Sequence, residues 1–275
     1  MRLQRRATLV ASYLIVLTAL VIFLFPIIWL FLGSIKQPAQ ILEISLPNPP
    51  TLQNYATILN SYPVARFLGN SLRVALLSTA ISVLVGALAA YAFTRYRFPG
   101  SNVGLLFALG MRMLPAIAVS IPLYLLFSRV QLTNTTFGLV MAHSAIIQIP
   151  LVIWIMYGFF QDIPHELAEA GLVDGCNRLT VLYHIVFPLA APGLAVAGVF
   201  AFLFSWNDFG LSLIMVSTPD LLTMPVALSQ MNLQYGVRWD NLSAAAVMYV
   251  VPTMIMALLL QRYITRGLTA GAVKG

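Results

Sequence analysis

Long apolar segments, separated by short polar ones, occupy more than half of this chain. Each apolar segment has about 20 or more residues, which is the length that an α-helix needs to cross the hydrocarbon core of a bilayer. The pattern therefore predicts an all-α membrane protein with six transmembrane helices. We place these spans at residues 9–32, 72–94, 103–128, 137–160, 189–215 and 242–263. No internal repeat divides the chain, and we expect residues 1–275 to form a single transmembrane domain.

Composition argues against a soluble protein. Hydrophobic residues make up 60% of the chain and charged residues only 8%, whereas a soluble domain carries about 25% charged residues. The segments between the spans are too short for a separate catalytic domain and show no catalytic spacing, so we do not expect an enzyme. A single cysteine, Cys176, excludes an intrachain disulfide. We predict no metal site and assign no role to the scattered His143, His165 and His184.

The basic residues predict the orientation of the chain, because cytoplasmic segments are enriched in Lys and Arg. With a cytoplasmic N-terminus, nine basic residues fall inside and five fall outside. The inside residues are Arg2, Arg5, Arg6, Arg95, Arg97, Arg178, Arg262, Arg266 and Lys274, and the outside residues are Lys36, Arg66, Arg73, Arg129 and Arg238. We therefore expect both termini in the cytoplasm. The net charge of +7 fits anionic lipid headgroups, and no basic stripe indicates a nucleic acid partner.

The longest segment predicted outside the membrane covers residues 34–71. Its Pro47-Asn48-Pro49-Pro50 run breaks regular structure. Thr51 can then cap a short helix that continues to Leu59. This segment is either a connector or a docking or gating surface, and its length slightly favours the second interpretation.

A polar segment between the fourth and fifth spans, residues 161–188, predicts a short cytoplasmic helix. Pro164 suits the first turn of a helix. Glu166 and Glu169 then lie near its N-terminal end, where the helix dipole favours negative charge. Gly175 can end the helix as a C-terminal cap.

One face of this predicted helix carries small residues. Ala170 and Gly171 share that face with Leu167, because they lie three and four residues further along. Small side chains there would let a partner surface approach the backbone closely. The alternative is a solvated connecting loop, but the succession of helix signals favours a docking helix.

The same segment resembles the EAA loop of the permease subunits of binding-protein-dependent ABC importers. The family motif consists of E-A-A, D-G-A, an aromatic residue, I-x-L-P and a later proline. In this chain those positions are Glu169-Ala170-Gly171, Asp174-Gly175-Cys176, Tyr183, Ile185-Val186-Phe187-Pro188 and Pro192. Gly171, Cys176 and Phe187 depart from the motif, and the first two keep its size class. The location between the fourth and fifth of six spans also matches the family.

Three further stretches resemble the carbohydrate-uptake branch of that family. Residues 261–275, with the sequence QRYITRGLTAGAVKG, are similar to the C-terminal tail of the maltose-type inner-membrane permease group. Trp206-Asn207-Asp208 resembles the W-N-D/E segment of carbohydrate permeases, and Asn70-Ser71-Leu72 resembles the N-S-L that opens the second span of the family. The resemblance therefore covers nearly the whole chain.

The resemblance implies a type I importer permease fold, in which the EAA loop forms a cytoplasmic coupling helix. It implies one permease subunit of an ATP-driven importer in a bacterial or archaeal cytoplasmic membrane, forming half of the path for a sugar or polyol by alternating access. The implied partners are a second permease subunit, two ATPase subunits and an external solute-binding protein. The chain has no phosphate-binding G-x-x-x-x-G-K-[ST] loop, so we expect no cofactor in it, with ATP and Mg on the ATPase subunits. A secondary transporter or channel subunit with six transmembrane helices is the alternative.

Three groups of candidate site residues follow. The ATPase-coupling residues implied by the EAA resemblance are Glu166, Glu169, Ala170, Gly171, Asp174 and Gly175. In the cytoplasmic tail, residues 264–275, the implied ATPase contacts are Gly267, Leu268, Thr269, Gly271, Lys274 and Gly275, and a disordered terminus is the alternative. The translocation path is predicted from polar residues that are costly in lipid, namely Arg112, Gln148, Asn207 and Asp208. Each of these four could equally be a helix-to-helix contact.

Overall fold

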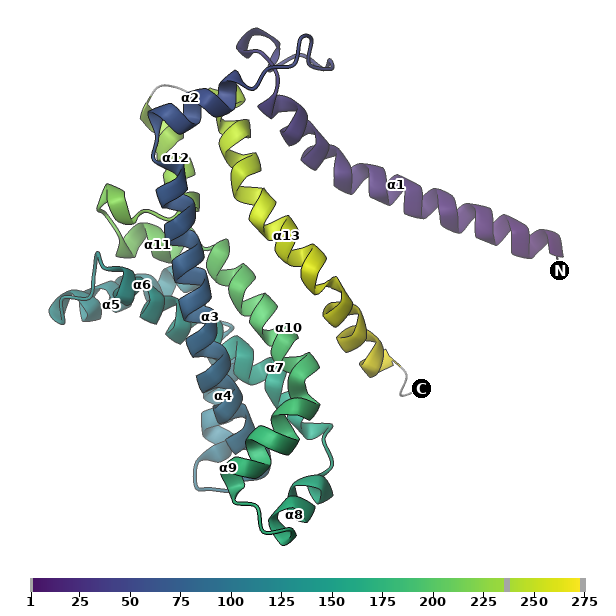
Figure 1. The fold of residues 1–275 in the computed structure, drawn as a ribbon, viewed down its shortest axis with the longest axis vertical. Helices are drawn as coiled ribbons and strands as arrows, with labels where there is room; N and C mark the ends of the chain where they lie inside the picture. The colour runs from purple at the N-terminus through teal and green to yellow at the C-terminus, as the bar shows by residue number, and fades with distance from the viewer. Residues whose placement is uncertain (1, 235–237, 273–275) are drawn as a thin grey trace. The chain divides into compact units, whose positions relative to one another are not determined.

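The computed structural model describes residues 2–234 and 238–272, apart from the side chains of residues 2–8, 10, 116, 232–234 and 259–272. All regular secondary structure in these residues is helical, as the sequence predicts (Figure 1). Within the part of the chain that the structure describes, five helical stretches are long and apolar enough to cross a membrane, at residues 11–34, 64–95, 136–161, 178–206 and 239–258. The described residues between 2 and 65 and between 228 and 252 form one compact unit, and those between 66 and 227 and between 253 and 272 form a second.

The first unit contains α1 (Arg2–Ser34), η1 (Pro38–Gln40) and α2 (Gln53–Ser61). Asn54 in α2 is buried, and its Nδ2 donates hydrogen bonds to the carbonyl oxygens of Ser34 and Lys36, at 3.0 and 2.8 Å. The last carbonyl groups of a helix lack intrahelical donors, so Asn54 fixes α2 against the end of α1. The backbone N–H of Gln53 also bonds Thr51 Oγ1 at 3.1 Å. The short helix predicted from Thr51 to Leu59 is therefore present as α2, two residues further along the chain.

The second unit holds most of the remaining helices, and two of its elements are short π-helical segments within longer helices. Its elements are α3 (Val64–Arg95), α4 (Ser101–Met111), α5 (Ala116–Arg129), α6 (Thr136–Ala142), the π-helix η2 (His143–Gln148), α7 (Ile149–Gln161), α8 (His165–Val173), α9 (Arg178–Val181), the π-helix η3 (Leu182–Val186), α10 (Phe187–Trp206), α11 (Gly210–Met215) and η4 (Pro219–Leu221). The two units share α12 (Met224–Gln234) and α13 (Trp239–Ala272).

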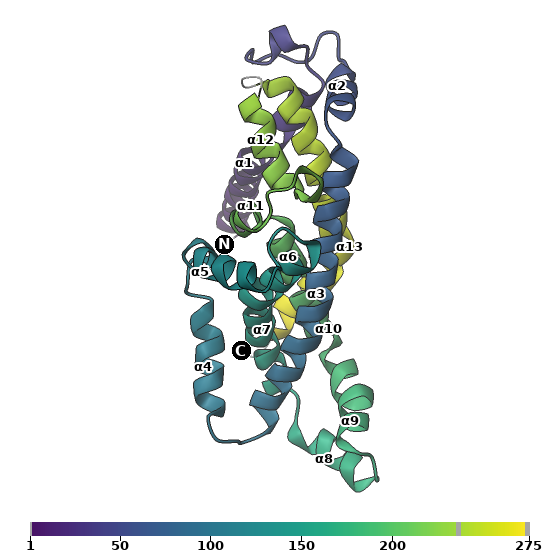
Figure 2. The same cartoon turned by 90° about the vertical axis from the view of Figure 1, so that its left-hand side faces the viewer.

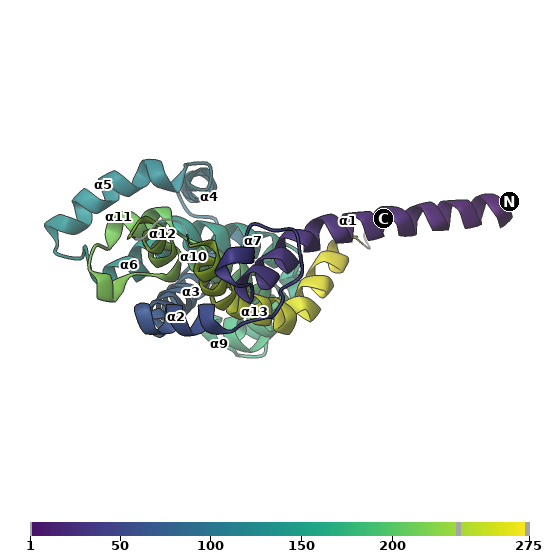
Figure 3. The ribbon, with the colours of Figure 1, turned by 90° about the horizontal axis from the view of Figure 1, so that it is seen from above.

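The arrangement of the second unit separates two places of functional interest. Figure 2 shows α8 and α9 together, at the same end of the unit as the last turn of α3. At some distance from that end, α5 runs beside α11 (Figure 3). The polar segment that contains α8 therefore lies in a different part of this unit from α5 and α11.

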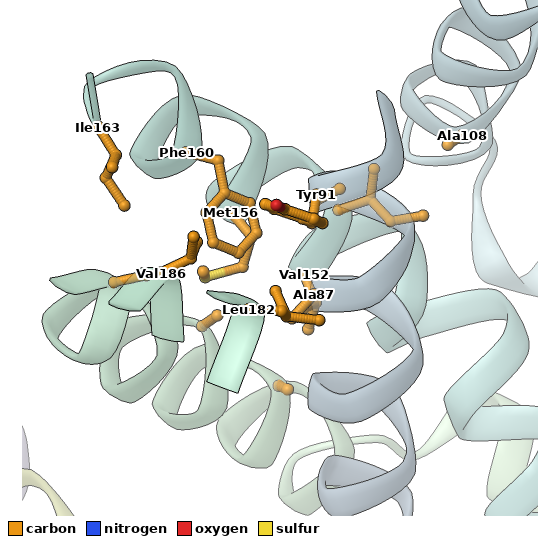
Figure 4. Packing of buried hydrophobic residues seen from close by; sticks show 14 of the residues in the cluster. Ala87, Tyr91, Ala108, Val152, Met156, Phe160, Ile163, Leu182 and Val186 are labelled. Atoms are coloured by element: carbon orange, nitrogen blue, oxygen red, sulfur yellow. The ribbon is translucent and has the colours of Figure 1, made fainter. Parts of the chain in front are cut away.

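The core of the second unit forms where α7 packs between α3 and α10. Met156 and Phe160 of α7 are fully buried, and Tyr91 of α3 lies edge-on to Phe160 with ring centroids 5.6 Å apart (Figure 4). Small residues allow this close approach, as is usual between membrane helices. A Cβ atom at Gly86 of α3 would lie 2.8 Å from Val152 of α7. This core holds the elements that carry both regions of interest.

The predicted third span, residues 103–128, is divided into two helices. α4 ends at Met111, and α5 begins at Ala116 after a turn that contains Pro115. Pro115 has an extended ψ of 128°, and a proline disfavours helical geometry in the residue before it. The prediction of one continuous span was wrong, because the residues on both sides of the turn are apolar and their pattern alone does not reveal the break.

The predicted fifth span, residues 189–215, begins and ends earlier than expected. The chain is helical from Arg178 to Trp206 and breaks before α11. Pro188 lies in the first turn of α10 and does not end this helical stretch, although proline lacks the N–H that would bond the preceding turn. The π-helix η3 immediately before it accommodates the missing hydrogen bond and lets the helix continue. The same device occurs at η2, which directly precedes Ile149-Pro150.

Candidate coupling helix and translocation cavity

The predicted short helix of the polar segment is present as α8, and both of its ends are defined by the sequence. Pro164 occupies the N-cap position, with Glu166 in the first turn. Gly175 follows the C-cap with a φ of +88°, which glycine adopts without steric cost. The N–H groups of Cys176 and Gly175 bond the carbonyls of Gly171 and Leu172 at 3.0 and 3.1 Å. These two bonds form a Schellman motif.

The exposed side of α8 is acidic and partly apolar. Glu166, Glu169, Ala170 and Asp174 are exposed, and Val173 is 87% exposed. Leu167 and Leu172 of the same helix are exposed as well. Several exposed apolar side chains on one short helix favour a surface that a partner covers. Among the predicted coupling residues, Gly175 is also exposed.

Gly171 lies on the opposite side of α8 and is buried. A Cβ atom on Gly171 would lie 2.6 Å from Ile185 Cδ1 and 3.1 Å from Val181 Cγ2. The absence of a side chain at Gly171 therefore lets α9 and η3 of the same chain pack closely against α8. The prediction that Gly171 shares an outward small-residue face was wrong, because sequence spacing alone does not decide which side of a helix faces the protein.

A cavity of about 580 Å³ lies where three interruptions of long helices meet. The interruptions are the α4–α5 break, the π-helix η2 and the α10–α11 break. Irregular backbone at membrane depth is tolerated where it is buried in protein or lines a water-filled cavity. The cavity is lined by Met111, Arg112, Leu114, Ile146, Ile147, Phe200, Leu203, Phe204, Asn207, Asp208 and Phe209.

Arg112 is the C-cap of α4 and lies at the cavity wall. Its Nη1 donates a hydrogen bond to the carbonyl oxygen of Ile147 at 3.2 Å, and its guanidinium lies over the ring of Phe204, 4.9 Å from the centroid. Among the described residues, no ion pair neutralises Arg112. The cation is therefore held by a carbonyl and an aromatic face.

Asp208 is fixed at the α10–α11 break by three donors. Its side chain is 9% exposed. The carboxylate accepts hydrogen bonds from the backbone N–H and the hydroxyl of Ser212, both at 2.9 Å, and lies 3.3 Å from His143 Nε2. His143 Nδ1 in turn lies 2.7 Å from Ser205 Oγ. Asn207, the neighbouring cavity residue, donates from Nδ2 to the carbonyl of Leu203 at 2.8 Å.

His143 is a residue that sequence reasoning missed. It is fully buried and connects the α10–α11 break to η2. The only sequence signal is its position inside an apolar span, where a polar side chain usually finds an intramembrane partner.

Gln148 lies away from the cavity lining and joins three helices. Its Nε2 donates to the carbonyl of Ala201 in α10 at 2.9 Å and to Ser78 Oγ in α3 at 3.0 Å. Its Oε1 accepts from Ser82 Oγ at 2.8 Å. Gln148 has no exposed surface. Of its two interpretations, the helix-to-helix contact is the one that this geometry fits.

The predicted tail contacts fall mostly beyond what the structure describes. Gly267, Leu268, Thr269 and Gly271 continue the helical backbone of α13. The side chains of Leu268 and Thr269 lie outside what the structure describes, as do Lys274 and Gly275 altogether. The tail contact therefore stays a prediction. Within the described residues, no group of three or more His, Cys, Asp or Glu side chains could hold a metal ion.

Comparison with known proteins adds family and fold. Residues 82–270 match the family model described as "Binding-protein-dependent transport system inner membrane component". The chain is 35% identical to the sulfoquinovosyl glycerol transport system permease of Agrobacterium fabrum, over 92% of this chain and 89% of that protein. It is 34% identical to the trehalose transport system permease of Mycobacterium tuberculosis, over 96% and 98%. It is 35% identical to the trehalose/maltose permease of Thermococcus litoralis, over 93% of both chains.

A solved structure confirms the fold expected from the resemblance. The chain aligns with a TM-score of 0.83 and 22% identity to a chain in the crystal structure of a bacterial ABC transporter involved in the import of the acidic polysaccharide alginate. The alignment covers 96% of this chain and 98% of that one. A second structure, of a bacterial alginate ABC transporter with an alginate pentasaccharide-bound periplasmic protein, aligns with a TM-score of 0.73.

Proposed function

Because the chain belongs to the family of binding-protein-dependent transport system inner membrane components, we propose that it forms half of the path by which an importer carries a sugar or polyol. It is a multi-pass transport subunit of the inner membrane and not an enzyme. Relatives are named for sulfoquinovosyl glycerol, trehalose and maltose, which all contain sugar units. The family argues against the secondary transporter and the channel.

The proposed assembly contains a second permease subunit, two ATPase subunits and an external solute-binding protein. The chain carries no phosphate-binding loop, so the proposed ATP and Mg sites lie on the ATPase subunits. We place both termini in the cytoplasm, because the basic residues are concentrated at the ends of the chain and in the segments that this orientation puts inside.

α8 is the proposed contact with one ATPase subunit. The observation that carries this proposal is its two-sided construction, with Gly171 packed against η3 and with Glu169, Asp174 and Val173 exposed. Closure of the ATPase pair on ATP would then draw α8 along with it. ATP would thereby favour one of the two conformations of the permease pair, by its preference for the closed ATPases.

The cavity beside Arg112, Asn207 and Asp208 is the proposed part of the path. An arginine without an ion-pair partner is costly in lipid, so we place this cavity in contact with water, the solute or the second permease. Polar side chains beside the aromatic rings of Phe204 and Phe209 suit a solute with hydroxyl groups and apolar ring faces.

Uptake into vesicles tests the function. The permease pair, the ATPases and the binding protein are reconstituted, and accumulation of labelled sugars and polyols is measured. We expect accumulation that requires both ATP and the binding protein. Accumulation driven by an ion gradient without ATP would instead identify a secondary transporter.

The tail proposal is tested by truncation. Deleting residues 269–275 should impair uptake or its regulation while the complex still assembles, because the tail is proposed to touch the ATPases and not the membrane core. Assembly is checked by co-purification. A truncated complex that transports and hydrolyses ATP like the intact one contradicts the tail contact.

A further inference from the structure

Arg95, the last residue of α3, is bound to the segment that leads into α8. Its Nη2 donates hydrogen bonds to the carbonyl oxygen of Ile163 at 2.7 Å and to that of Phe160 at 3.3 Å. Phe160 belongs to the last turn of α7, and Ile163 precedes the N-cap Pro164 of α8. One guanidinium group therefore holds the whole turn between α7 and α8.

The hydrogen bonds of Arg95 go to backbone groups that need a donor. The last carbonyls of a helix have no intrahelical partner, and a positive charge at that end is favoured by the helix dipole. The side chain of Ile163 is buried in the core. The turn is thus fixed to α3 through its backbone carbonyls and to the core through the side chain of Ile163. It therefore has little freedom to bend independently of α3.

Tyr96, the residue directly after α3, contacts the chain on the other side of α8. The guanidinium of Arg178, at the start of α9, lies over the ring of Tyr96, 5.4 Å from the centroid. Tyr91 lies edge-on to both Tyr96 and Phe160, with centroids 6.0 and 5.6 Å apart. Arg95 at the end of α3 and the following residue Tyr96 therefore contact the segments before and after α8.

No acidic residue shares the guanidinium of Arg95 in an ion pair within the described chain. Its Nε and Nη1 are buried and have no hydrogen-bond partner in the same residues. The group is therefore placed by the carbonyls of the turn and not by a carboxylate. Since arginine presents a rigid fork of donors and lysine a single ammonium group, the two residues should not be equivalent here.

We propose that Arg95 is a positioning residue that passes the movement of α8 to α3. This inference rests on the proposed coupling role of α8. In this arrangement a displacement of α8 moves the end of α3 with it. Without Arg95, the turn at residues 161–164 absorbs part of the displacement, and ATP hydrolysis becomes less tightly linked to transport.

The test compares Arg95→Met with Arg97→Met in the complete importer, reconstituted with the ATPases and the binding protein. Arg97 is exposed two residues further along and serves as the matched control. The readout is the amount of solute imported per ATP hydrolysed. We expect this ratio to fall by about fivefold or more in Arg95→Met and to stay at the wild-type value in Arg97→Met. An unchanged ratio in Arg95→Met overturns the inference.

Arg95→Lys separates positioning from mere stability. The lysine ammonium can reach one carbonyl but not hold both, so its ratio should lie between the wild type and Arg95→Met. If Arg95→Met does not assemble, Arg95→Lys carries the test, and a wild-type ratio there overturns the inference. Failure of the proposed function has a different result: the wild-type complex shows no ATP-dependent uptake, which overturns both.

Discussion

The proposed coupling helix α8 and the cavity at the helix breaks differ in how their polar residues are placed. On α8, Glu169 and Asp174 are exposed to solvent, and the opposite side of the helix packs at Gly171 against η3. At the cavity, Asp208 is held by Ser212 and His143. A substitution on the exposed side of α8 should therefore change function without changing the fold. A substitution of a residue that holds Asp208 should change both the function and the stability of the fold.

The largest expected effect is on α8. Glu169→Lys reverses a charge at the proposed ATPase contact, and we expect uptake to fall by about 10- to 100-fold. The chain should still insert and assemble, because Glu169 is exposed. Glu169→Gln keeps the size of the side chain and should lose less. Normal uptake with substrate-stimulated ATP hydrolysis in Glu169→Lys would exclude this residue from the contact.

The next effect concerns the support of the cavity. His143→Leu leaves the buried Asp208 carboxylate with one donor fewer, which should lower the free energy of unfolding by about 1–3 kcal/mol. His143→Gln keeps a donor group and should be milder. Denaturation of the purified chain in detergent measures both variants. Equal stability of the leucine variant and the wild type would show that the His143–Asp208 contact contributes little.

A smaller and more local effect is expected behind α8. Gly171→Val places methyl groups where Ile185 already lies, and such overpacking costs about 1–3 kcal/mol. Ala170→Val is the matched control, because Ala170 is exposed and the substitution leaves the packing of Gly171 unchanged. A surface substitution of this kind changes the free energy of unfolding by no more than about 0.5 kcal/mol. Equal stability of the two variants, by the same denaturation, would contradict the packing of α8 on η3.

The two regions also differ in how far the sequence predicts them. α8 was predicted because its signals are local: Pro164 at the start and Gly175 at the end act within a few residues of the backbone they control. The direction in which Gly171 faces depends on η3, and spacing along one helix does not contain that information.

The cavity depends on contacts between distant parts of the chain. The contact between His143 and Ser205 joins residues 62 positions apart, and no motif links them. Arg112 and Asp208 were singled out by their cost in lipid, but the helix breaks beside them were not. The hydrophobicity averaged along the sequence stays high across Pro115, so it does not reveal the helix break there. Nor does it reveal that a π-helix lets the helix continue past Pro188.

Thiol accessibility at the cavity measures most directly whether α8 controls the path. Asn207→Cys is made in a Cys176→Ser background, with the buried Gln148→Cys as the control, and each is exposed to a membrane-impermeant thiol reagent in reconstituted vesicles with and without ATP. We predict that the reaction rate at position 207 changes between the two states, that Glu169→Lys abolishes this change, and that position 148 stays unreactive. A rate at position 207 that is the same in every state, or that still responds to ATP in Glu169→Lys, would contradict the account.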